Sequence, residues 1–328
     1  MRRALILGAL VAGGACSHAS GTASQGPAPA AAPPAPSASA IEAVQLKQNL
    51  YLLRGGGRTV QIGGVSVPNA GNSLAFITAS GVILVDTKVP GWGKPLIDKI
   101  KEITDKPVTT VVNTHTHMDH VSGNVELPAG VEIVAQENTA RLMAEMRPVS
   151  GGPKQRNLFQ ENGGRGLPTR TFKDHMTIGS GDDRVELHWF GPAHTGGDAW
   201  VVFPSAHVVH VGDVFGYKAV PPLDVNNGAS GVEYPGTLAR ALAALADVDV
   251  VITGHYPTPL TLADLRTYAD FVGEFVQAVQ VAKRTGQTVD DFLGAWKIPD
   301  RFLADGYVSV EHLRPIRADV EAVWNETK

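Results

Sequence analysis

The segment 114–120, which reads Thr-His-Thr-His-Met-Asp-His, constrains the fold of this chain more than any other stretch. It places three imidazoles and one carboxylate within the six positions from His115 to His120. Imidazole and carboxylate side chains at such short spacing are typical of a metal site. The segment therefore predicts that the chain folds around a metal centre.

Three later ligand-type residues each follow an apolar run that reads as a strand. His194 lies in Gly-Pro-Ala-His-Thr, Asp213 in Val-His-Val-Gly-Asp, and His255 in Val-Ile-Thr-Gly-His. The first motif likewise begins where a predicted buried strand, 108–112, ends. Open α/β sheets commonly place their sites at the carboxyl ends of the strands. We therefore expect a common edge for His115, His117, Asp119, His120, His194, Asp213 and His255.

The composition is that of an ordinary globular protein, with 328 residues of which 43% are hydrophobic and 18% charged. Such a chain is long enough for one large domain or two small ones. The formal net charge of −4 gives no general attraction to nucleic acid, whose binders usually carry a concentrated basic face. We expect a small-molecule substrate and no nucleic-acid partner.

The amino-terminal residues 1–15 have the features of a signal peptide. Basic residues precede a short apolar run, Ala4–Ala12, and small residues follow it. This run is too short to span a bilayer as a helix. The single cysteine, Cys16, stands where a lipoprotein carries its lipid anchor, although Gly13 replaces the leucine usual three residues earlier. We expect export, either as a periplasmic protein or as a lipoprotein anchored to the inner or outer membrane.

Residues 16–40 consist mostly of Ala, Pro, Ser and Gly and cannot bury enough apolar surface to fold. We interpret them as a disordered linker, which serves as a tether or is simply the tail of the signal segment. The folded domain is expected at 41–328, with helices at its carboxyl end.

Apolar runs and helical periodicity alternate through this domain, which predicts a layered α/β fold. Strands are expected at 50–53, 73–78, 82–85, 108–112, 131–134, 184–190, 199–203, 207–211 and 248–252. Helices are expected at 94–103, 136–146, 237–246, 262–284, 288–296 and 312–324. In an extended segment alternate side chains share a face, so His115, His117 and Asp119 should point together, while a turn at 119–123 redirects His120.

The short motif and its three outlying residues together resemble the metallo-β-lactamase superfamily, over nearly the whole folded chain. The resemblance implies a four-layer αββα sandwich that binds two metal ions, usually Zn²⁺. It implies one ion held by His115, His117 and His194, the other by Asp119, His120 and His255, and a bridge between them at Asp213.

Three protein ligands per ion and a bridge leave coordination positions open, which indicates catalysis. Two such ions would hold a bridging hydroxide that attacks a carbonyl or phosphoryl centre. Asp119 is the predicted catalytic residue, because it can also orient the nucleophile. The expected reaction is hydrolysis.

The bond to be hydrolysed stays open between an ester, a lactone and a β-lactam. Gly216 stands three residues after Asp213, where β-lactamases of the cysteine-containing subclass have a lysine, and this weakens the β-lactam interpretation. A bridging Asp is more similar to glyoxalase II and the lactonases. The alternatives are a thioester hydrolase of the glyoxalase II type, a di-iron redox relative and a non-catalytic metal-binding relative.

Several further residues have weaker signals. Asp86 and Asp198 are candidates to accept a proton from a ligand imidazole, or to stabilise turns. Tyr217 and Lys218 are candidates for contact with a substrate carboxylate. The long loop 151–172 is either a rim that receives an anion through Arg156, Arg165 and Arg170 or a solvated insertion. Surface or core roles are expected for His175, His188, His207, His210 and His312.

Overall fold

The computed structural model describes residues 36–312 and 314–328. The expected signal peptide, Cys16 and most of the expected linker lie outside these residues. A short 3-10 helix at Ala38–Ala40 leads directly into the first strand at Ile41. Within the described ranges, none of the helices combines the length and the apolar character needed to cross a membrane.

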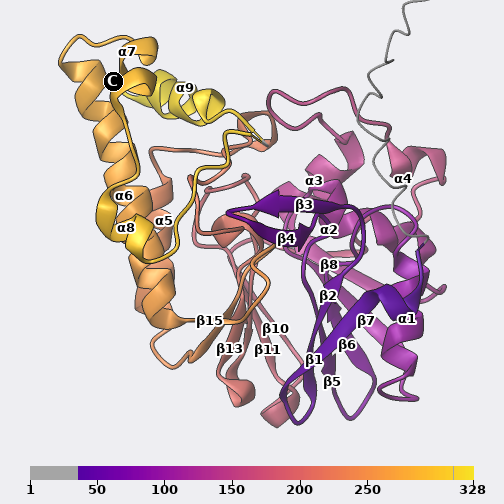
Figure 1. The fold of residues 1–328 in the computed structure, drawn as a ribbon. Helices are drawn as coiled ribbons and strands as arrows, with labels where there is room; N and C mark the ends of the chain where they lie inside the picture. Colours follow the sequence, from indigo (N-terminus) through magenta and orange to yellow (C-terminus); the bar gives the residue numbers. More distant parts are fainter. Residues whose placement is uncertain (1–35, 313) are drawn as a thin grey trace, which may run out of the picture. The chain divides into compact units, whose positions relative to one another are not determined.

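Two mixed sheets form the centre of the described fold (Figure 1). The seven-stranded sheet consists, in spatial order, of β1 (Ile41–Lys47), β2 (Leu50–Gly55), β5 (Ser73–Ile77), β6 (Val82–Val85), β7 (Val108–Asn113), β8 (Glu132–Gln136) and β9 (Arg170–Phe172). The six-stranded sheet consists of β10 (His175–Ile178), β11 (Val185–His188), β12 (Trp200–Phe203), β13 (Val208–His210), β14 (Val250–Ile252) and β15 (Leu260–Thr261). A separate antiparallel hairpin consists of β3 (Thr59–Ile62) and β4 (Val65–Pro68).

The two sheets face each other across an apolar core. Alternate residues of each strand point into it, such as Leu74 and Phe76 on β5 and Val185 and Leu187 on β11. Phe76 packs edge-on against Phe203 of the opposite sheet, with ring centroids 5.1 Å apart. The period-two pattern of the strands is therefore what joins the sheets into a sandwich.

Helices cover the outer face of each sheet. On the seven-stranded sheet, α1 (Gly93–Lys101) buries Leu96 and Ile100 in the same apolar cluster as Leu84 and Val111. On the six-stranded sheet, α5 (Tyr234–Ala244) and α6 (Leu262–Arg284) pack into one cluster with Trp200. Figure 1 shows α1 on one side of the strands and α5 with α6 on the other. The four-layer αββα sandwich is confirmed.

The remaining α-helices of the described chain are α2 (Met118–Val121), α3 (Glu137–Glu145), α4 (Leu158–Glu161), α7 (Val289–Ala295), α8 (Asp300–Ala304) and α9 (Arg317–Glu326). The helix expected from residue 312 begins instead at Arg317, because the segment before it packs as an irregular connection. In this segment the Ile316 amide donates to the side chain of Glu311, 3.1 Å away, and not to a helical carbonyl. The side chain of His312 likewise bonds the carbonyl of Gln61, 2.8 Å away on β3.

Parallel pairing brings several strand ends to one edge. In the first sheet β6, β7 and β8 run parallel, and in the second β13 and β14 do. Six of the candidate ligands follow β7, β13 and β14, and His194 lies in the loop after β11, so this edge is where the sandwich positions them.

Candidate metal centre

The short motif leaves β7 as an extended segment and then turns into a helix. His117 has extended backbone angles, and α2 begins at the next residue, Met118. The expectation that Asp119 continues the alternation of His115 and His117 is therefore wrong. A carboxylate in the first turn of a helix is favoured by the partial positive charge of that helix end, and the turn aims Asp119 and His120 differently from the first two imidazoles.

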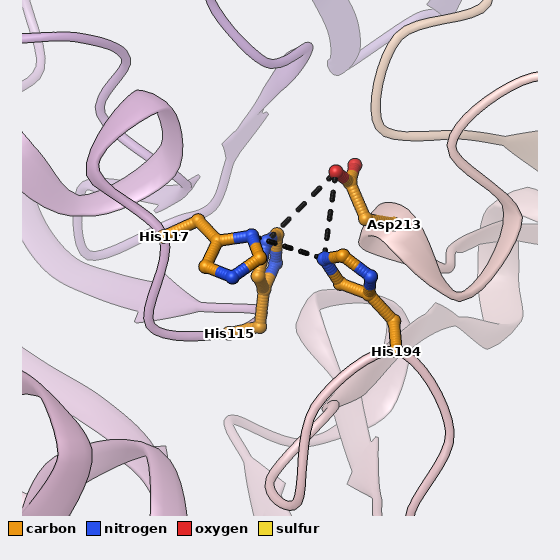
Figure 2. Close-up of side chains that lie close together, drawn as sticks. All are labelled: His115, His117, His194 and Asp213. Atoms are coloured by element: carbon orange, nitrogen blue, oxygen red, sulfur yellow. Dashed lines mark hydrogen bonds and ion pairs between the residues drawn. The ribbon is translucent and has the colours of Figure 1, made fainter. Parts of the chain in front are cut away.

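The three outlying candidates reach the same place from the second sheet. His194 lies in the loop between β11 and β12, Asp213 lies in a 3-10 helix, Gly212–Phe215, that follows β13, and His255 follows β14. Figure 2 shows His115 and His117 on one segment, with His194 and Asp213 facing them from two other segments. All seven predicted side chains thus come together.

These side chains form two groups. In each group, every residue offers one ligand atom, and these atoms lie within 4.8 Å of one another. The first group contains His115, His117, His194 and Asp213, and the second contains Asp119, His120 and His255. This is the same division that the resemblance implies.

Asp213 lies between the two groups. Its Oδ2 is 3.7 Å from His194 Nε2 and 4.0 Å from His115 Nε2 in the first group. Its carboxylate is also 3.4 Å from the Nε2 atoms of His120 and His255 in the second group. One carboxylate in contact with both groups is the geometry that a bridging ligand needs.

Four of the imidazoles have one ring nitrogen held from outside the centre, which leaves the other nitrogen aimed inward. The outer partners are Thr114 Oγ1 for His115 (3.0 Å), Asp224 for His117 (2.7 Å), Asp86 for His120 (2.7 Å) and the Pro222 carbonyl for His194 (2.7 Å). Such partners fix the tautomer and the orientation of a metal-binding imidazole. The rings are therefore organised around the centre.

The expected outer carboxylates have different outcomes. Asp86 is fully buried and accepts from His120 Nδ1, as predicted. Asp198 instead accepts hydrogen bonds from the amide and hydroxyl of Thr195, so it stabilises a turn. Asp224, which holds His117, was not predicted, because its sequence, Leu-Asp-Val-Asn-Asn-Gly, is that of any polar turn.

The electrostatics of the centre suit a cation. Burial and the neighbouring imidazoles His120 and His117 hold the pKa of His115 well below its usual range. Burial and, to a lesser extent, the neighbouring His117 lower the pKa of His194 to about 4. Neutral imidazoles with free lone pairs are the form that binds metal ions. Burial raises the pKa of Asp119, but the charges of His120 and His255 outweigh it and lower the pKa to about 2.

Two atoms at the centre test whether a metal fits there. Among the described residues, His115 Nε2 and Asp213 Oδ1 are buried with no hydrogen-bond partner. An unsatisfied buried polar atom costs about 1–3 kcal/mol. Both are ligand atoms of the kinds that zinc accepts, so a cation would satisfy them, and the residues fit a metal site.

Glycines allow the backbone to approach these side chains closely. A Cβ at Gly254 would lie 1.7 Å from Asp213 Oδ1, and one at Gly71 would lie 2.3 Å from a ring carbon of His120. Neither position has room for a side chain.

The structure does not support two of the suggested contacts with an anionic substrate, which leaves the solvated insertion as the interpretation of the loop 151–172. Lys218 does not face the centre, because its Nζ is 3.0 Å from Asp264 and 3.3 Å from Asp305, next to the carboxyl-terminal helices. The arginines of the loop 151–172 are also engaged: Arg156 pairs with Glu161, Arg165 donates to the Leu127 carbonyl, and Arg170 pairs with Glu132. Lys218 and these three arginines are therefore engaged within the chain and not free for a substrate. Ser150, the residue just before this loop, donates to Asp224, which in turn holds His117.

A family model described as the metallo-beta-lactamase superfamily matches residues 67–255, which is more than half of the chain. The chain belongs to the metallo-beta-lactamase superfamily. Metallo-beta-lactamase IND-1 of Chryseobacterium indologenes is 25% identical over 190 residues, which are 56% of this chain and 71% of that protein. Membership of this superfamily makes the chain a metal-dependent hydrolase.

Solved structures show the same fold. The metallo-beta-lactamase from Pontibacter korlensis has a TM-score of 0.56 and 22% identity, and the alignment covers 71% of this chain and 99% of that one. The mono-zinc form of FIM-1 from Pseudomonas aeruginosa has a TM-score of 0.56 and 17% identity, and the alignment covers 74% of this chain and 97% of that one. Residues 256–328, which include α6 to α9, lie beyond the match to the superfamily model.

Proposed function

We propose that this superfamily member is an exported hydrolase that uses two zinc ions to cleave an ester, lactone or β-lactam bond. The observation that carries the proposal is the convergence of seven ligand atoms in two groups, with Asp213 in contact with both. Imidazole and carboxylate ligands in this proportion suit zinc. The proposed ions would be held by His115, His117 and His194 and by Asp119, His120 and His255, with Asp213 shared.

Bound cations of this kind polarise a substrate oxygen and lower the pKa of water from 15.7 to roughly 7. The chain's own residues do the positioning. Asp119 has the most exposed side chain of the second group, at 28%, compared with 0% for His120 and 18% for His255. Its low pKa keeps it ionised, so it can accept a hydrogen bond from the attacking water and orient it. His255 Nε2, 3.1 Å away, holds the carboxylate in place.

A cavity beside His255 supports a small-molecule substrate. Its volume is about 330 Å³, within the range typical of small-ligand pockets, and its lining includes Arg54, Ser66 and Asn72. Ser66 belongs to β4, so the β3–β4 hairpin forms part of the wall. Arg54 is paired with Glu42 at 2.8 Å and is not a free cation.

The proposal of export rests on the first sixteen residues, whose basic start, apolar run and Cys16 are those of an exported or lipid-anchored protein. Fractionation of the producing cells, with labelling by a radioactive fatty acid, tests it. Label on the native chain and none on Cys16→Ser would support anchoring, and recovery of the protein with the cytoplasmic fraction would contradict export.

The activity is tested with a panel of a chromogenic cephalosporin, an acyl-lactone, an ester, a thioester and a phosphodiester. We expect turnover of at least one of the first three, loss after chelation, and recovery as two equivalents of zinc are returned. Hydrolysis of the thioester alone would favour the glyoxalase II alternative. Iron in the purified protein, or full activity after complete chelation, would overturn the zinc proposal.

A further inference from the structure

Two histidines outside the metal centre lie opposite each other on neighbouring strands. His175 begins β10, His188 ends β11, and the two are direct partners in the antiparallel register. Their ring centroids are 4.7 Å apart. Direct partners of an antiparallel pair project from the same face of the sheet. Glu186, two residues before His188, shares this face, and its Oε2 is 3.4 Å from His188 Nε2.

We propose that His175, Glu186 and His188 form a separate binding site for a divalent transition-metal cation such as Zn²⁺. The three residues each offer a ligand atom, and these atoms lie within 4.8 Å of one another. A tetrahedral zinc ion with bonds of roughly 2.0–2.1 Å needs its ligand atoms about 3.4 Å apart. Small side-chain rotations close this gap, because His175 is exposed and the other two side chains are partly so.

The neighbours of this site hold two of its ligands in position. The His188 ring stacks on Phe190 at 5.3 Å with planes 5° apart, which restricts its rotation. Arg184 lies 3.4 Å from Glu186 Oε1 and leaves Oε2 for a cation.

The site lies on the outer face of the six-stranded sheet, where the helices do not cover it. Val185 and Leu187 point into the core between the sheets, so Glu186 and His188 point outward. Helix α5 reaches this face as far as Phe190, whose carbonyl accepts from Arg240. His188 and Glu186 retain 22% and 25% side-chain exposure, which leaves room for a cation and for water as its further ligands.

A cation at this site would join two strands at the edge of the six-stranded sheet. β10 is the edge strand of its sheet, and the chain reaches it directly from β9, the edge strand of the other sheet. With one ligand on β10 and two on β11, a bound ion stabilises the pairing of this edge. Because a ligand that binds only the native state shifts unfolding by mass action, zinc should raise the melting temperature through this site as well as through the hydrolytic centre.

The experiment uses the full chain and three single variants. His188→Ala and His175→Ala each remove one ligand. Thr177→Ala is the matched control, because Thr177 is on β10, exposed on the same face as His175, and pairs with Glu186. Each protein is dialysed to equilibrium over a graded series of free zinc, and bound zinc is measured by mass spectrometry. Circular dichroism verifies that each variant is folded.

We expect the native chain and Thr177→Ala to bind one zinc ion more than the two histidine variants. The zinc-dependent rise in melting temperature should be smaller in the histidine variants by roughly 5 °C when free zinc is 100-fold above the Kd of the site. Glu186→Gln, which leaves both imidazoles, should bind the extra ion more weakly. Equal zinc content in all folded proteins, or an equal loss in Thr177→Ala, would overturn the proposal.

Discussion

The buried carboxylate of Asp86 offers a sharp test of how the chain organises its metal centre. It accepts three hydrogen bonds, from the Thr114 amide (2.8 Å), the Thr114 hydroxyl (2.6 Å) and His120 Nδ1 (2.7 Å). Asp86→Asn keeps the shape of the side chain but removes its charge. The new NH₂ group must also face at least one of these donors, so at least one contact is lost.

The expected loss of stability follows from these hydrogen bonds. A hydrogen bond to a charged group contributes about 1.5–3 kcal/mol, and breaking a buried charged pair costs about 3–5 kcal/mol. We expect Asp86→Asn to lower the free energy of unfolding by about 3 kcal/mol, which corresponds to roughly 6–12 °C in melting temperature. Because His120 loses its orienting partner, zinc affinity should also fall about 10–100-fold.

Asp198→Asn is the control, because Asp198 is also buried and accepts from the amide and hydroxyl of a threonine, Thr195, but bonds no imidazole. Denaturant unfolding in chelator measures stability, and zinc competition titration measures affinity. Both variants should lose stability, but Asp86→Asn should lose far more zinc affinity. If zinc affinity falls equally in the two variants, or is unchanged in Asp86→Asn, the inferred role of Asp86 in orienting His120 is refuted.

Three further outcomes are expected. Asp119→Ala should lower kcat at least about 100-fold, since it removes both a proposed ligand and the group proposed to orient the attacking water, and unchanged turnover in a steady-state assay would contradict this role. Gly254→Ala should stay folded but contain less zinc in metal analysis, because its Cβ would lie 1.7 Å from Asp213 Oδ1. A variant with full metal content would show that the backbone moves enough to accommodate the Cβ. Burial lowers the pKa of Lys88 to about 7, so above that pH the unfolded chain binds more protons than the folded chain. The free energy of unfolding of the metal-free protein should therefore rise from pH 7 to about 10. Lys88→Met should flatten this rise in denaturant titrations, and an equally steep rise would exclude Lys88 as its source.

The sequence predicts well those elements whose periodicity is strong. Helix α6 begins and ends where expected, because Thr261 and Asp264 form a capping box before a long amphipathic run. The strands β5 and β6 also form close to where they are expected, and they pair as an antiparallel hairpin. The β3–β4 hairpin was not predicted, although Gly63-Gly64 is a recognisable two-residue turn, because its strands are short and largely exposed.

Within the candidate site, the sequence predicted which side chains come together but not the direction in which each one points. Strand ends locate His194, Asp213 and His255, since the sheet edge collects them. The turn into α2 depends on how Asp119 and His120 pack against the rest of the fold, and the spacing of residues in the sequence does not predict that packing. Lys218 and Asp224 show the same limit, since their partners lie 46 and 107 residues away in the sequence.

The ligand groups come from both sheets, with His115 to His120 following β7 and Asp213 and His255 following strands of the second sheet. A nascent or unfolded chain therefore contains only the short motif as a preformed fragment of the site, and the complete set exists only after the two halves have docked. High-affinity zinc uptake should accordingly be a late event in folding, and the ion should slow the separation of the halves once it is in place.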